Sequence, residues 1–214
     1  MLSPKCAAFS NDKGSRLRWT FSPADTLLLL DVDPHLTLET VALDPPQRLA
    51  ILVTDAPGFN FQCPHGELLV AVRSYFSAAE GSDRLWTFEC QPPPHYLGEP
   101  TECWWDDINR AGMEWFSVCS KNAMVAGVQS QYFSSVLDRE WQFYCCRYGR
   151  RCPYSCWRTT DVPEYYREEG DMTVPGYGYF IRGAQTTFSG VLRDRQWKYI
   201  VCRITDFDCE FENF

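Results

Sequence analysis

Residues 138–146 read DREWQFYCC, and their first four letters belong to a motif that decides the fold. The motif Asp-Arg-x-Trp occurs three times, at residues 83–86, 138–141 and 194–197, with spacings of 55 and 56 residues. An aliphatic residue stands thirteen positions before each Asp, and a cysteine stands seven or eight positions after it. This regularity predicts a repeated structural unit of about 55 residues.

Apolar and polar residues alternate within each unit, as in residues 69–73 and 86–90, and this pattern predicts short strands. Side chains two positions apart share one face of a strand, so the Arg and the Trp of each motif should lie side by side, with the guanidinium over or beside the indole. The same alternation points Cys145 and Cys146 to opposite faces, so we expect them to have different disulfide partners. The motif residues are Asp83, Arg84, Trp86, Asp138, Arg139, Trp141, Asp194, Arg195 and Trp197.

The repeated motif has two interpretations. It could be a ligand site used three times, as in lectins with threefold repeats. Alternatively, the Asp caps a turn and the Arg stacks on the Trp to close each unit. We favour the second interpretation, because a large Trp side chain usually points into the core.

The composition changes along the chain. Residues 1–56 hold three aromatic residues and one cysteine, Cys6, whereas residues 57–214 hold the other 30 aromatic residues and ten cysteines. Prolines at positions 23, 34, 45 and 46 would cut any helix short in the front segment. We therefore expect residues 1–56 to be a divergent, poorly ordered segment before one domain over residues 57–214. The first five residues lack the charged and apolar stretches of a secretory signal.

Ten cysteines in one domain predict the disulfide framework of a secreted protein. The only spacing that suits zinc is Cys152-x3-Cys156 beside Cys145-Cys146. No Cys-x2-Cys pair occurs and the three histidines are far away in sequence, so neither zinc nor another cofactor is expected. Cys6 would then be the odd thiol. Spacing alone does not fix the connectivity; our assignment pairs Cys63 with Cys90, Cys119 with one of Cys145 and Cys146, Cys103 with the other, Cys156 with Cys202, and Cys152 with Cys209.

Charge and motif content exclude several classes of function. The chain has 20 Lys and Arg against 28 Asp and Glu, a net charge of -8, which argues against nucleic acid as the main partner. No apolar run approaches the roughly 18 residues that a membrane helix needs, so no membrane insertion is expected. The chain has no nucleophile elbow, zinc-protease motif or phosphate-binding glycine loop, so we expect no enzyme.

Several long stretches resemble the dermatopontin family. They are GEPTECWW at 98–105, INRAGMEW at 108–115, VLDREWQFYCCR at 136–147 and DCEF at 208–211, and the resemblance runs from about residue 58 to the end. It implies a small secreted extracellular matrix protein that binds dermatan-sulfate proteoglycans such as decorin and a growth factor of the transforming type, promotes collagen fibril assembly and supports cell adhesion, with an integrin as a further partner. Invertebrate relatives are associated with haemagglutination, which implies carbohydrate binding.

The front segment departs from the family pattern. Family members carry a signal peptide and then an acidic, tyrosine-rich stretch, whereas residues 1–56 contain no tyrosine. Either the chain has an unusual start or its start is misassigned.

An arginine cluster is the sharpest candidate for binding an anionic polysaccharide. The guanidinium group suits sulfate and carboxylate groups, and the chain is otherwise acidic. The alternative is a solvated loop, held by disulfides, whose charges balance nearby acids. The cluster comprises Arg147, Arg150, Arg151 and Arg158.

Two further segments are candidates for contact or modification. Residues 64–74 match a segment that dermatopontins are thought to use in cell binding, and we select His65, Gly66, Glu67 and Arg73 as contact points. Tyr165 and Tyr166 lie among acidic residues, a setting that favours tyrosine sulfation, although an acidic surface loop explains it at least as well.

These observations lead to one hypothesis. The chain should be an all-β, disulfide-rich domain of three similar units with approximate threefold pseudo-symmetry. Its expected function is that of a non-enzymatic matrix adaptor that binds proteoglycan glycan chains. The alternative is a multivalent lectin that uses the three Trp motifs.

Overall fold

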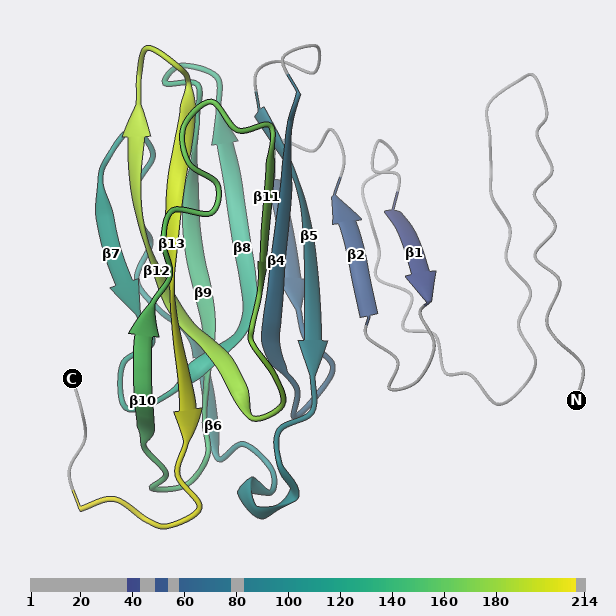
Figure 1. Ribbon diagram of the computed structural model, residues 1–214, viewed down its shortest axis with the longest axis vertical. Coiled ribbons are helices and arrows are strands. Elements are labelled where there is room, and N and C mark those ends of the chain that lie inside the picture. Colours follow the sequence, from purple (N-terminus) through teal and green to yellow (C-terminus); the bar gives the residue numbers. More distant parts are fainter. Residues whose placement is uncertain (1–37, 43–48, 54–57, 78–82, 211–214) are drawn as a thin grey trace, which may run out of the picture. The chain divides into compact units, whose positions relative to one another are not determined.

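The computed structural model describes residues 38–42, 49–53, 58–77 and 83–210 (Figure 1). These residues form three antiparallel sheets and one short 3-10 helix, η1 (His95–Leu97). The described part of the chain contains no α-helix. The prediction of an all-β, disulfide-rich domain is therefore confirmed.

A long hairpin forms the centre of each sheet. The second strand of each hairpin begins at the Asp of one motif, and residues along it alternate between buried and less buried positions, as the sequence pattern requires. The hairpins are β4 (Leu68–Ser77) with β5 (Asp83–Gln91), β8 (Met124–Phe133) with β9 (Asp138–Arg147), and β12 (Tyr179–Ser189) with β13 (Asp194–Ile204).

The outer strands exchange between sheets. The strand that precedes each hairpin in sequence does not join that hairpin but pairs with the first strand of another one. Thus β3 (Gly58–Gln62) pairs with β8, β7 (Trp115–Val118) pairs with β12, and β11 (Glu169–Thr173) pairs with β4. The three exchanges form a closed cycle, so no sheet can leave the others without losing strand pairs.

On the other side of each hairpin, a further strand pairs with the second strand of that hairpin. The strand after each of the first two hairpins crosses to the next sheet, where β6 (Glu102–Trp105) pairs with β9 and β10 (Pro153–Arg158) pairs with β13. In the remaining sheet this edge is taken by β2 (Leu49–Val53), which pairs with β5 and is itself joined by β1 (Leu38–Ala42).

The strand order agrees with three similar units, while the approximate threefold pseudo-symmetry and the domain boundary at residue 57 stay predictions. Residues 38–42 and 49–53 form strands although they lie in the segment expected to be poorly ordered. The rest of residues 1–56, including Cys6, lies outside the described residues.

All five assigned disulfides are present. They join Cys63 to Cys90, Cys103 to Cys146, Cys119 to Cys145, Cys152 to Cys209, and Cys156 to Cys202. The neighbours Cys145 and Cys146 have different partners, as expected from their opposite directions on β9. Each closed loop restricts the unfolded chain and could contribute about 2–4 kcal/mol to stability.

Each long hairpin contains one irregularity at the same place, a register shift near the start of its first strand. In β8 and β12 this place holds Gly127 and Gly183. A Cβ atom on Gly127 would lie 2.6 Å from the carbonyl oxygen of Phe61, and one on Gly183 would lie 2.1 Å from that of Ser117. The neighbouring edge strand therefore approaches too closely for any side chain at these positions.

The Gly183→Ala substitution should destabilise the fold by about 1–3 kcal/mol, because the new methyl group must push the backbone of β7 away. Gly190→Ala is the matched control, because no heavy atom lies within 4 Å of a Cβ atom built there. Denaturant unfolding of the oxidised proteins measures both values. Equal stability of the two variants would show that the close approach of β7 is not a constraint.

Candidate functional site

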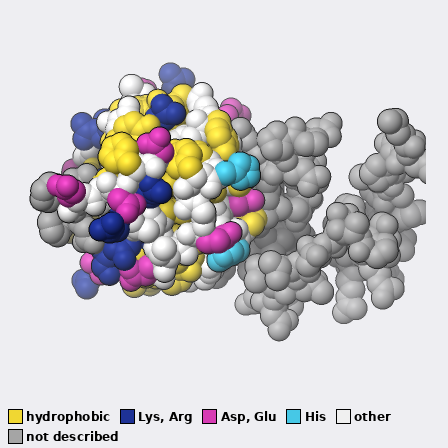
Figure 2. Space-filling view, turned by 90° about the horizontal axis from the view of Figure 1, so that it is seen from below, with side chains coloured by type: hydrophobic (Ala, Val, Ile, Leu, Met, Phe, Trp, Pro, Cys, Tyr) yellow, Lys and Arg dark blue, Asp and Glu magenta, His cyan; other side chains and the backbone are white. Residues whose placement is uncertain are grey.

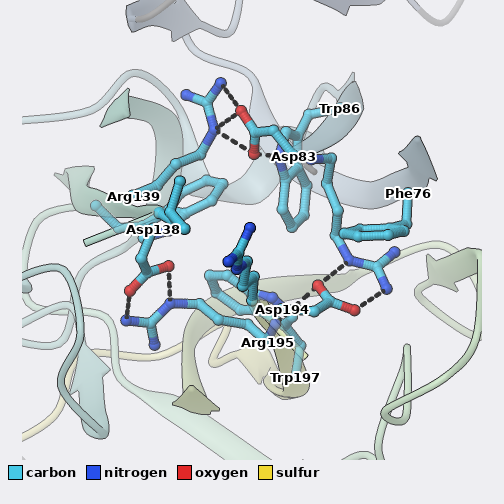
Figure 3. A pocket seen from close by; sticks show the side chains of 12 residues that line it. Phe76, Asp83, Trp86, Asp138, Arg139, Asp194, Arg195 and Trp197 are labelled. Carbon is cyan, nitrogen blue, oxygen red and sulfur yellow. Dashed lines mark hydrogen bonds and ion pairs between the residues drawn. The ribbon is translucent and has the colours of Figure 1, made fainter. Parts of the chain in front are cut away.

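The charged residues of the three motifs form a closed cycle of ion pairs (Figure 3). Each arginine binds the aspartate of a different motif rather than its own. Arg84 donates to Asp194 at 2.7 Å from both Nε and Nη2, Arg139 donates to Asp83 at 2.6 Å, and Arg195 donates to Asp138 at 2.8 and 2.6 Å. The cycle ties the second strands of the three hairpins together.

These pairs are withdrawn from water. The arginine side chains are 3–7% exposed, and those of Asp138 and Asp194 are 5% and 9% exposed. Asp83 and Asp194 also accept a hydrogen bond from the next backbone N–H, which caps the start of their strands. Buried charges of this kind require their partners, because a single unpaired charge in the interior is costly.

The predicted contact between each arginine and the indole of its own motif differs from what the structure shows. The guanidinium groups of the three motif arginines lie over other rings, at 5.5–5.9 Å from the ring centroids. Arg84 lies over Phe76, and Arg195 lies over Trp115 and Phe188. Each arginine forms an ion pair with the aspartate of another motif, and this pair places its guanidinium group away from the tryptophan of its own motif.

The three motif tryptophans pack on one another at the centre of the domain. The ring centroids of Trp86, Trp141 and Trp197 are 4.7, 4.9 and 5.5 Å apart, with interplanar angles of 73–78°. These residues are only 2–3% exposed. The rings therefore offer no face to a sugar, and a lectin that binds through them would have no exposed ring to use.

The predicted arginine cluster divides into two parts. Arg147 ends β9, and Arg150 and Arg151 lie on the turn that follows it. Arg158 lies at the far end of β10, where it donates to Gln185. The turn is at the end of the domain that Figure 2 views, where Lys and Arg side chains gather on one side with Asp and Glu among them. Arg158 is not part of this group.

The three turn arginines and one lysine share two carboxylates. Arg147 and Lys121 lie 3.2 and 3.5 Å from Glu102. Arg150 and Arg151 lie 2.9 and 3.8 Å from Asp208. Cations outnumber carboxylates among these six side chains, and we call this surface the basic turn.

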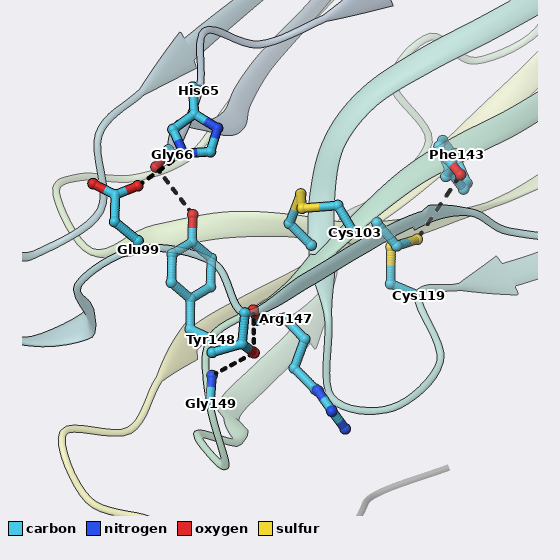
Figure 4. The surroundings of a disulfide bond; sticks show 12 residues. His65, Gly66, Glu99, Cys103, Cys119, Phe143, Arg147, Tyr148 and Gly149 are labelled. Carbon is cyan, nitrogen blue, oxygen red and sulfur yellow. Dashed lines mark hydrogen bonds and ion pairs between the residues drawn. A yellow bond between two sulfur atoms is a disulfide. The ribbon is translucent and has the colours of Figure 1, made fainter.

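Disulfides hold the basic turn in place. Four of its charged residues are sequence neighbours of bonded cysteines: Glu102 of Cys103, Arg147 of Cys146, Arg151 of Cys152 and Asp208 of Cys209. Figure 4 shows Arg147 beside Cys103 and the turn at Tyr148 and Gly149. Lys121, Glu102 and Asp208 were missed by the sequence analysis, although their nearness to cysteines was a usable signal.

The predicted cell-binding residues lie in two places. His65 forms an exposed contact of 3.1 Å with Glu99, and the carbonyl of Gly66 accepts a hydrogen bond from Tyr148 (Figure 4). Glu67 is half-buried, and burial raises its pKa. Arg73 lies in β4, about 16 Å beyond Leu68 at the start of that strand, and contacts Glu89 and Asp171.

The two candidate tyrosines differ in access. Tyr166 is 83% exposed, whereas the hydroxyl of Tyr165 donates to Thr187 at 3.0 Å. Only Tyr166 therefore presents a free hydroxyl to a modifying enzyme. Sulfation of either residue stays a prediction.

Comparison with known proteins identifies the family. The dermatopontin family model matches residues 55–207. The chain is 67% identical over 156 residues to dermatopontin from Mus musculus and to dermatopontin from Homo sapiens, covering 73% of this chain and 78% of each relative. The chain belongs to the dermatopontin family. The resemblance of its motifs to this family is thus confirmed.

More distant members retain the match over most of their length. Dermatopontin from Biomphalaria glabrata is 25% identical over 146 residues, which cover 68% of this chain and 94% of that protein. No solved structure matches the chain. Dermatopontins are known as extracellular matrix proteins rather than enzymes, and this chain is an extracellular matrix protein of that family.

Two negative findings apply to the described residues. No group of three His, Cys, Asp or Glu residues among them could hold a metal ion. None of their helices is long and apolar enough to span a membrane.

Removing one charge from the cycle should destabilise this dermatopontin strongly. Asp138→Asn leaves Arg195 buried without a carboxylate, and we expect the free energy of unfolding to fall by about 3–5 kcal/mol. Asp208→Asn removes the same charge from a half-exposed carboxylate and should change stability by less than about 1 kcal/mol. Urea unfolding measures both stability losses. Similar losses in the two variants would show that the buried cycle stabilises the fold no more than a surface charge does.

The buried phenol of Tyr148 predicts a pH effect. Burial, followed by the nearby charges of Glu99 and Glu67, raises its pKa well above the ordinary value of 10. The unfolded state therefore loses this proton first, and the Tyr148 contribution to stability falls as the pH rises above about 10, by about 1.4 kcal/mol per pH unit. Unfolding at pH 9 to 11 should show Tyr148→Phe losing less stability than the unchanged chain; parallel losses would refute this.

Proposed function

We propose that this protein is a secreted, non-enzymatic matrix adaptor that binds the dermatan sulfate chains of a decorin-like proteoglycan at the basic turn. The observation that carries this proposal is the sharing of two carboxylates among Lys121, Arg147, Arg150 and Arg151. Through that contact the protein would help organise collagen fibrils.

Electrostatics favour this surface over others. The chain carries a net charge of -8, so a region with four cations and two acids contrasts with its surroundings. The Arg150 side chain is 78% exposed and that of Lys121 is 51% exposed, so both reach solvent without rearrangement. Sulfate and carboxylate groups of a glycan could replace Glu102 and Asp208 as partners of these cations.

The disulfides supply preorganisation. Cys103–Cys146 and Cys152–Cys209 fix the backbone beside four of the charged residues, so little order has to be gained on binding. Several cations anchored on a fixed backbone also favour ligands with repeated anionic groups. Binding should therefore require the oxidised protein.

The remaining partners are proposed from family membership. The exposed turn at His65, which is 83% exposed in its side chain, is the surface that we assign to cell adhesion, with an integrin as the receptor class. Collagen and a growth factor are the other proposed partners, and the described residues give no specific site for either.

Retention on immobilised dermatan sulfate, eluted with a salt gradient, tests the main proposal. Arg150→Ala/Arg151→Ala should elute at lower salt than the unchanged chain, and the slope of log affinity against log salt should fall by about one for each lost contact. Asp208→Asn should elute at higher salt, because it removes the acid that competes with the glycan.

Arg110→Gln/Arg167→Gln is the matched control. It removes two exposed arginines away from the turn and should elute with the unchanged chain. Equal loss in this control and in the Arg150/Arg151 variant would mean that only total charge matters. No retention of the unchanged, oxidised protein would overturn the proposal.

A further inference from the structure

The strand that flanks β5 differs in origin from its two counterparts. In the other two sheets, the strand beside the second hairpin strand is β6 or β10, and both lie within the region that matches the dermatopontin family model. Beside β5 this place belongs to β2, which ends at Val53, before the matched region begins at residue 55 (Figure 1). The region shared with the family therefore does not supply the strand that flanks β5.

The chain after the third hairpin does not fill this place either. By the pattern of the first two hairpins, the strand that follows β13 would cross to β5. The described residues after β13 instead pack against the turn that follows β9: the backbone N–H of Thr205 donates to the carbonyl of Cys152, and that of Cys209 donates to the carbonyl of Arg150. A strand that precedes all three hairpins therefore pairs with β5.

The flanking strand β2 contains no cysteine, in contrast to β6 and β10. Cys103 of β6 is bonded to Cys146 of β9, and Cys156 of β10 is bonded to Cys202 of β13. The sequence has no cysteine between residues 6 and 63, so no disulfide can join β2 to β5. This strand can leave its place without the breaking of a covalent bond.

The connection that follows β2 is short. Four residues, 54–57, separate β2 from β3, and β3 pairs with β8 in a different sheet. Short connections favour the exchange of the adjoining strand between two copies of a chain, because the exchanged strand does not have to turn back onto its own domain. The sequence and the topology thus combine a strand without a disulfide and a short connection.

We infer that β5 is an acceptor for an added strand and that β2 of a second copy occupies it in a strand-exchanged dimer. Backbone hydrogen bonds supply most of the affinity when a strand adds to a sheet. The register pairs that β2 makes with β5, from Ala50 with Glu89 to Val53 with Trp86, are offered unchanged by any other copy of the chain. Monomer and dimer contain the same strand pairs, so the protein concentration selects between them.

The exchanged dimer would carry two basic turns. Under the proposed function, one dimer would hold a glycan chain at two places or join two chains, and this bivalence would strengthen retention. The inference itself rests on the strands around β5 and does not require that the basic turn binds a glycan.

Disulfide cross-linking between two different copies tests the inference. Leu52 and Thr87 are directly opposed in the register of β2 and β5, at a separation that a disulfide can span. Leu52→Cys is placed in one full-length chain and Thr87→Cys in another, both with Cys6→Ser to remove the odd thiol. Incubation and oxidation of the mixture should yield a heterodimer joined through positions 52 and 87, and its yield should rise with protein concentration.

The matched control replaces Thr87→Cys by Val191→Cys. Val191 is 92% exposed, so a thiol there bonds another copy through random collision. The yield with Leu52→Cys should be several-fold lower than that of the 52–87 pair. Equal yields would overturn the inference.

Sedimentation of the full, oxidised chain gives a second measurement. The dimer fraction should rise with concentration, and insertion of Gly-Ser-Gly after Asp55 should lower it, because a longer connection lets β2 return to its own β5. A chain that stays monomeric, or a dimer that forms without the 52–87 cross-link, would overturn the inference. Arg150→Ala/Arg151→Ala should form the dimer normally, so this inference and the proposed function fail separately.

Discussion

The exchange of ion pairs between distant motifs is the constraint on which the rest of this structure depends. Arg84 and Asp194 are 110 residues apart, yet they form a buried pair with two hydrogen bonds of 2.7 Å. Because burying either charge alone is costly, each buried pair requires two hairpins to be in place together. The strand exchanges of β3, β7 and β11 impose the same condition on the backbone. The three sheets are therefore expected to form together or not at all.

Buried and exposed charges have different roles in this account: buried ion pairs stabilise the fold, and exposed cations are proposed to bind a glycan. Arg195 is buried with Asp138, where salt screens the interaction weakly. Arg150 is mostly exposed beside Asp208, where salt screens it strongly and where a glycan can compete for it. The fold should consequently tolerate salt concentrations that abolish binding of an anionic polysaccharide. Under the proposed function, this difference would let the protein release a glycan without losing its structure.

The sequence predicted the parts of the fold that local spacing determines. The inward direction of Trp141 follows from the size of its side chain. The separate partners of Cys145 and Cys146 follow from a period of two residues along the strand. The partner of Arg84 could not be predicted in this way, because it depends on which hairpins meet in space. For the same reason the predicted stacking of each arginine on its own tryptophan differs from the observed contacts with rings such as Phe76.

The candidate site was predicted less completely than the fold. The arginines of residues 147–151 were found from composition, but Arg158 belongs elsewhere and Lys121 joins through its contact with Glu102. Charge clusters are assembled from segments far apart in sequence, so a run of arginines shows only part of one.

A double-mutant cycle on Arg84 and Asp194 tests the central claim most directly. The free energies of unfolding of the unchanged chain, Arg84→Met, Asp194→Leu and the double variant give the coupling between the two side chains. The account predicts a coupling of about 2–3 kcal/mol. The double variant should lose less free energy of unfolding than the two single variants lose together. A coupling below about 0.5 kcal/mol would contradict it, because the two motifs would then contribute independently.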